Sequence, residues 1–299
     1  LIELKRIKFT FIYAVTLALA ACSLLYELLI AQTLATLAAN TVVWYSLTIG
    51  VYLGGMGLGA LIHTKRTIKN LWARLFRVEI MLCVMGTLAV PILHFAHTFG
   101  LMFYFSEYHF LTNFIFFGTA LFLTAAIGLL TGFELPLLID LGNTASLGDK
   151  VTNRVLASDY LGSLLAGFTF PLLLMPNFDL ITVGLLTASI NLAVALLALW
   201  WASLPPEQIA RRLSFCGVLA TTILFSFFSV SSIEQYFMKK YYYYWDYAEE
   251  FTQFLGSLSV VENVFRTRSP YQQIDLVYDD EGYHTDDLID IYSTKFLEN

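Results

Sequence analysis

The stretch FDLITVGLLTASINLAVALLALWWA, residues 178–202, decides the fold class. It has a single charged side chain, Asp179. A helix needs about 20 apolar residues to cross the roughly 30 Å hydrocarbon core of a bilayer. Similar apolar runs occur near residues 9–34, 41–63, 76–98, 110–139, 155–175 and 213–232. The sequence therefore predicts an all-α integral membrane helix bundle of about seven transmembrane helices.

The composition agrees with a membrane protein. Of 299 residues, 58% are hydrophobic and 13% are charged, whereas about a quarter are charged in a typical soluble domain. The expected partner is thus the lipid bilayer. No basic patch indicates nucleic acid. Cys22, Cys83 and Cys216 lie inside apolar runs without the spacing of a metal or redox motif, and we expect them in the core.

Basic residues predict the orientation, because Lys and Arg are retained in cytoplasmic loops. Alternate loops, near 35–40, 99–109 and 176–177, contain no Lys or Arg. The other loops and the N-terminus are basic, through Lys5, Arg6, Lys8, Lys65, Arg66, Lys69, Arg74, Lys150, Arg154, Arg211 and Arg212. We predict a cytoplasmic N-terminus, and a seventh crossing would place the C-terminal part outside.

The composition changes after residue 232, which predicts a division into three parts. Residues 1–232 form the bundle, and 233–257 form an interfacial aromatic linker that includes four successive tyrosines from Tyr241. In residues 258–299, SLSVVENVFRT and YQQIDLVYDDEG flank a turn at Arg268, Ser269 and Pro270. Their β-rich residues predict a β-hairpin that opens an incomplete soluble domain.

Acidic residues inside the apolar runs are the candidate functional residues, because a charge in hydrocarbon needs a partner or a water-filled cavity. Glu27, Glu134 and Asp159 form the candidate intramembrane polar site. One interpretation is a pocket for a cationic ligand such as a polyamine. The alternative is structural: Asp159 pairs with Arg154, and Glu134 caps or bridges helices. For Glu79, near a predicted helix end, the structural role is favoured. No catalytic residues or metal ligands are assigned.

Glycines recur at helical spacing in the second run, at Gly50, Gly54, Gly55, Gly57 and Gly59. Small residues in the fifth run, including Gly162 and Ala166, repeat in the same way. Such faces let helix backbones approach closely. A phosphate-binding loop is disfavoured, because no strand precedes these glycines and no P-loop lysine follows. The pattern predicts helix packing and a possible homo-oligomer.

Five stretches resemble a known family: SLLYELLIAQ (23–32), GVYLGGMGLGALI (50–62), TGFELPLL (131–138), ASDYLGSLLAG (157–167) and RTRSPYQQIDLVYD (266–279). They are similar to the membrane region fused to spermidine synthase-like domains, the polyamine aminopropyltransferases, in bacteria. The resemblance implies an inner-membrane protein that anchors an aminopropyl-transferring domain, with decarboxylated S-adenosylmethionine as co-substrate and no tightly bound cofactor. It implies that Gln272 contacts this substrate.

The resemblance also has limits. The family's glycine-rich nucleotide loop and its acidic catalytic residues have no counterpart in these 299 residues, so we expect the chain as given to be inactive as an aminopropyltransferase. Two hypotheses of other classes remain open: a transporter or binding bundle for a polyamine or small cation, and a membrane assembly module that docks other proteins through its glycine faces.

Overall fold

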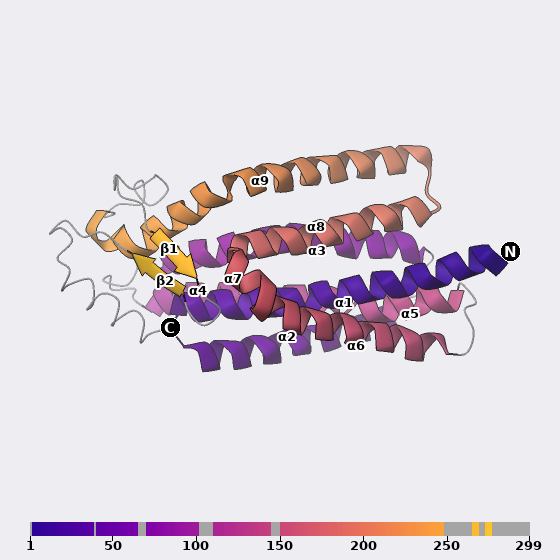
Figure 1. Cartoon of the computed structure of the whole chain (residues 1–299), viewed down its shortest axis with the longest axis horizontal. Helices are drawn as coiled ribbons and strands as arrows, with labels where there is room; N and C mark the ends of the chain where they lie inside the picture. Colours follow the sequence, from indigo (N-terminus) through magenta and orange to yellow (C-terminus); the bar gives the residue numbers. More distant parts are fainter. Residues whose placement is uncertain are drawn as a thin grey trace.

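The computed structural model describes residues 2–38, 40–64, 70–101, 110–144, 150–247, 265–268 and 273–276. These residues are almost entirely helical (Figure 1). The elements are α1 (Ile2–Ala38), α2 (Thr41–Thr64), α3 (Leu71–Leu101), α4 (Phe110–Thr131), α5 (Glu134–Thr144), α6 (Val151–Thr169), the π-helix η1 (Phe170–Leu174), α7 (Met175–Asn177), α8 (Leu180–Trp201), α9 (Pro206–Tyr247), β1 (Phe265–Arg268) and β2 (Gln273–Leu276).

Each predicted apolar run corresponds to a helical segment. Among the described residues, seven segments are long and apolar enough to cross a membrane, judged by length and composition alone. Two of the seven are interrupted. Pro136 clashes with the carbonyl of the residue four positions earlier, Gly132, and the helix breaks at Gly132 and Phe133 between α4 and α5. Near Pro171, α6 gives way to the π-helical turn η1 and the short α7.

The predicted fold class needs a correction. The predicted helical bundle is confirmed, the membrane location stays a prediction, and the β-hairpin that opens a separate soluble domain is wrong for the described residues. The described strands are only four residues each, paired antiparallel with Phe265 opposite Leu276. They contact the helical part, because Arg266 of β1 pairs with Glu234 of α9 at 3.0 Å. The described residues thus form a helical body and contain no separate β domain.

Helix α9 continues past the predicted boundary at residue 232. It runs without a break through Tyr247 and includes the tyrosine-rich segment. The division at 232, the interfacial linker and the C-terminal domain stay predictions, since most residues after 247 lie outside the described part of the chain.

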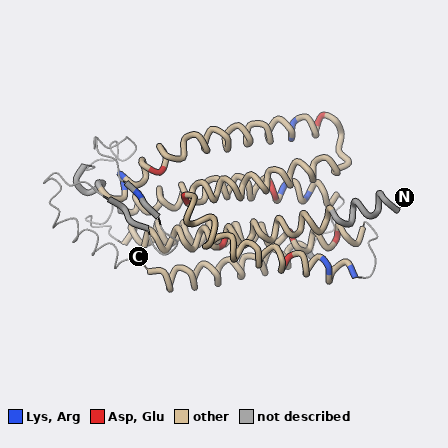
Figure 2. The backbone as a smooth tube through the Cα atoms, in the orientation of Figure 1, with Lys and Arg blue, Asp and Glu red and all other residues tan. Residues whose placement is uncertain are grey.

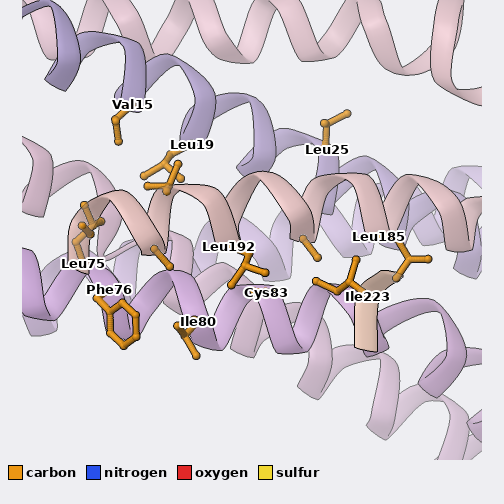
Figure 3. Close-up of a cluster of buried hydrophobic side chains, with 14 of the residues drawn as sticks. Val15, Leu19, Leu25, Leu75, Phe76, Ile80, Cys83, Leu185, Leu192 and Ile223 are labelled. Atoms are coloured by element: carbon orange, nitrogen blue, oxygen red, sulfur yellow. The ribbon is translucent and has the colours of Figure 1, made fainter. Parts of the chain in front are cut away.

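Helix α1 is central, because it contacts α2, α3, α4, α5, α6 and α8. One apolar cluster joins α1, α3 and α8 through residues such as Leu19, Cys83 and Leu192 (Figure 3). A second cluster joins α1, α2, α3 and α4 around Tyr26 and Ile127. Because α1 and α3 contribute to both clusters, polar groups between these two helices are buried deeply.

Glycines explain the close contact between α2 and α4, which confirms packing as their role at two positions. A Cβ atom on Gly55 would lie 2.7 Å from the Ala125 carbonyl oxygen, and one on Gly59 would lie 2.2 Å from that of Leu129. In α6, Gly162 lies against α1 in the same way. Gly50, Gly54 and Gly57 have no neighbour within 4 Å of such a Cβ. The glycines of α2 therefore divide into one packed face and one open face.

The N-terminus and the two strands lie at opposite ends of the bundle (Figure 1). Most described Lys and Arg residues gather toward the end where the N-terminus lies, and a second group lies beside the strands (Figure 2). The opposite positions of the N-terminus and the strands follow from the odd number of long helical segments, seven among the described residues, that run along the bundle.

Candidate functional site

The helix break brings Glu134 to the start of α5. Gly132 still donates its N–H to the Gly128 carbonyl at 2.9 Å, but Phe133 bonds only three residues back, to Leu130 at 3.1 Å. Glu134 is the first residue of α5, and only 5% of it is exposed. Unpaired N–H groups and the helix dipole favour an acidic group at this end of a helix. The break therefore positions a buried carboxyl group inside the bundle.

Glu79 of α3 lies against Glu134. The two carboxyl groups are within hydrogen-bonding reach of each other, and Glu79 is completely buried. Asn191 of α8, also completely buried, donates its Nδ2 to Glu79 Oε2 at 3.1 Å. A carboxylate oxygen only accepts hydrogen bonds. A hydrogen bond between Glu79 and Glu134 therefore requires a proton on one of them.

A second polar contact links α1 to α2 beside this pair. The Tyr52 hydroxyl donates to the Ser23 carbonyl oxygen at 2.8 Å and also lies 3.1 Å from Ser23 Oγ. The same hydroxyl reaches the Thr131 side chain, and it lies close enough to Glu134 and Glu27 to interact electrostatically. Side chains from six helices, α1 to α5 and α8, thus form one polar cluster in an otherwise apolar bundle.

The predicted site residues occupy different positions around this cluster. Glu134 is within it. Asp159 of α6 is half-buried and interacts electrostatically with Glu134. Glu27 is half-buried on α1 and interacts electrostatically with the Tyr52 hydroxyl. Gln272 lies outside the described residues. A functional polar site made of Glu27, Glu134 and Asp159 stays a prediction.

Sequence reasoning missed Glu79 as a partner of Glu134. The predicted helix began at residue 76, which placed Glu79 in its first turn. The structure begins α3 at Leu71, so Glu79 lies roughly 12 Å along the helix at 1.5 Å per residue. The available signal was the apolar side chains before it, Leu71, Trp72 and Leu75, which extend the run toward the N-terminus.

His94 and His97 have aromatic neighbours. The His94 ring stacks on Phe237 at 5.1 Å between centroids, and the His97 ring stacks on Tyr241 at 5.5 Å. Within the described residues, no group of three His, Cys, Asp or Glu side chains is placed to hold a metal ion. These histidines therefore join α3 to the C-terminal part of α9.

Comparison with known proteins shows similarity to curated proteins named polyamine aminopropyltransferase. The protein from Leptospira interrogans is 31% identical over 234 residues, which cover 78% of this chain and 44% of the relative. The protein from Oceanobacillus iheyensis is 34% identical over 184 residues, covering 60% and 33%. That from Mycobacterium tuberculosis is 34% identical over 187 residues, covering 61% and 34%. No family model and no solved structure matches the chain.

The similarity extends through the helices. Only 52 residues follow Tyr247, so most of the 234-residue match to the Leptospira protein lies in the helical part. The chain spans less than half the length of these curated relatives. The helical part of this chain is therefore similar in sequence to proteins named polyamine aminopropyltransferase, and the match covers less than half of each of these relatives.

Proposed function

We propose that this chain is the membrane-embedded helical part of a longer polyamine aminopropyltransferase. The observation that carries the proposal is the similarity to proteins of that name, which runs through the helices and leaves most of their length unmatched. In the proposed reaction a neutral amine attacks the aminopropyl carbon of decarboxylated S-adenosylmethionine. A C–N bond forms, the C–S bond breaks, methylthioadenosine leaves, and the amine loses a proton.

The helices would hold the enzyme at a bilayer. Seven segments have the required length and apolar composition. Large apolar side chains such as Phe122, Trp200 and Phe228 are mostly exposed, which suits contact with lipid chains and would favour aggregation in water. The protein would be integral to a bacterial inner membrane, with its N-terminus in the cytoplasm.

Cysteine labelling tests this orientation. Asn40 precedes α2, and Ser203 lies between α8 and α9; both are exposed. In intact cells, a membrane-impermeant maleimide should label Asn40→Cys and should label Ser203→Cys only after lysis. The native cysteines are buried and give the background. Labelling of Ser203→Cys in intact cells would reverse the proposed orientation, and equal labelling of both before lysis would argue against a spanning bundle.

An assay of the full-length protein tests the activity. Purified in detergent, it should release methylthioadenosine from decarboxylated S-adenosylmethionine when putrescine or another polyamine is added. A preparation that lacks residues 1–247 serves as the matched control and shows whether the helices are needed for turnover or only for attachment. A well-folded full-length protein without release, with every common polyamine, would refute the enzyme proposal.

A second candidate is a bundle that binds or transports a polyamine or another small cation. The observation that favours it is the buried acidic cluster, since Glu134 interacts with two further acidic groups, Glu79 and Asp159. Proteoliposome uptake of a labelled polyamine should then be lost in Glu134→Gln and Asp159→Asn. Uptake by these variants at the wild-type rate would remove the cluster from the argument.

A further inference from the structure

We propose that Glu79 and Glu134 form a proton-binding site inside the bundle, in which the two carboxyl groups share one proton. They come from α3 and from the start of α5, are both buried, and lie within hydrogen-bonding reach. Two carboxylates at this separation would repel each other without water to screen them. One proton converts the repulsion into a hydrogen bond.

The hydrogen bonds of Asn191 independently indicate that the cluster lacks a hydrogen-bond donor. Its Nδ2 bonds to Glu79, but its Oδ1 has no hydrogen-bond partner within the described part of the chain. Glu79 Oε1 likewise receives no N–H or O–H of the described residues. Buried polar atoms are rarely left without a partner. The cluster therefore has more buried acceptors than donors, and a bound proton supplies a donor.

The surroundings of the pair favour a proton over a permanent positive partner. Among the described residues, the titratable groups that interact with the pair include Cys22 and Tyr26 of α1, Tyr52 of α2, Cys83 of α3 and Asp159 of α6. None of these side chains can carry a positive charge. One cationic group also lies near: the guanidinium of Arg74 of α3 is 4.9 Å from the centre of the Phe133 ring. A pair that already holds one proton leaves at most a single negative charge to stabilise.

The position of the pair at a broken helix suits reversible binding. Where a helix is interrupted inside a membrane protein, freed backbone groups commonly line an ion or substrate site. Half-buried Asp159 interacts with Glu134 and offers an acidic group toward the edge of the bundle. The site depends on the fold and on the membrane location, and it does not depend on aminopropyl transfer.

Glutamine substitution tests the proposal, because a Gln amide donates a hydrogen bond permanently. In Glu79→Gln the amide can donate to Glu134 as the shared proton does, so folding at neutral pH should be preserved. The wild type should lose thermal stability as the pH rises above the ordinary range of a free carboxyl group, about 4–5, since the folded pair holds a proton that the unfolded chain has already released. Glu79→Gln should lose less, with about one proton fewer linked to unfolding.

Glu134→Gln provides a second variant should Glu79→Gln fold poorly. Glu207→Gln is the matched control, because Glu207 is exposed at the start of α9 and the chemical change is the same. Infrared spectra give a second measurement. At mildly alkaline pH the wild type and Glu207→Gln should show the carbonyl absorption of a protonated carboxyl group, which either single variant of the pair should lack.

The outcomes are decisive. Absence of that absorption in the wild type, or wild-type pH dependence in Glu79→Gln and Glu134→Gln, would overturn the shared proton. Neither result would bear on methylthioadenosine release by the full-length enzyme, so the two proposals fail separately.

Discussion

Replacement of Gly59 by alanine should weaken the contact between α2 and α4. The added Cβ would lie 2.2 Å from the carbonyl oxygen of Leu129 and 3.1 Å from the backbone of Gly132, where ordinary contacts are 3.4–4 Å. Both neighbours are backbone atoms, so no side-chain rotation relieves the clash. The two helices would have to separate by roughly 1 Å to restore normal van der Waals contact.

The magnitude follows from two opposing effects. Overpacking of a close contact costs about 1–3 kcal/mol, and the better helix propensity of alanine returns up to about 1 kcal/mol. We expect a net loss of about 1–2 kcal/mol in the free energy of unfolding. Gly57→Ala is the matched control on the same helix, because nothing lies within 4 Å of its Cβ position. It should be neutral or stabilise by up to about 1 kcal/mol.

The buried cysteines make the measurement simple. Cys22, Cys83 and Cys216 are free and buried, so a thiol-reactive fluorophore reports their exposure as the protein unfolds on heating in detergent. Gly59→Ala should unfold at a lower temperature than the wild type, and Gly57→Ala should not. If Gly59→Ala unfolds at or above the temperature of Gly57→Ala, the close α2–α4 contact is refuted.

Two further sets of substitutions test other contacts. Tyr52→Phe removes the hydroxyl that bonds to Ser23 and should cost about 0.6 kcal/mol, the average for hydrogen bonds between membrane helices, and at most about 1.7 kcal/mol. The same thermal assay measures it, and a Tyr52→Phe variant as stable as the wild type would mean that the bond contributes nothing. Glu234→Ala and Arg266→Ala should each cost about 1–3 kcal/mol, between the values for exposed and buried ion pairs. The double variant should lose less than the sum if their 3.0 Å contact is real.

Much of the helical architecture was predictable from the sequence because it depends on local composition. A run such as 178–202 is too apolar to be anything but a buried or lipid-facing helix, and α8 spans Leu180–Trp201. Helix ends were less predictable. Predicted starts at residues 76 and 155 fell several residues after the real starts of α3 and α6, because charged residues near the membrane boundary were assigned to loops. Only four residues of each predicted strand are described, Phe265–Arg268 and Gln273–Leu276, and these do pair.

The polar cluster was only partly predictable, because its geometry depends on contacts between distant segments. The sequence indicated Glu134 through the adjacent proline, which is a local signal. The pairing with Glu79 is not local, since the two positions are 55 apart in the sequence, and it depends on how α3, α5 and α8 pack. An error of five residues in the start of α3 was enough to move Glu79 from the bundle interior to its predicted edge. The accuracy of predicted helix boundaries therefore limits the prediction of buried polar sites in a bundle. A shift of about one and a half turns in a helix start decides whether a carboxyl group is expected to face water or another carboxyl group.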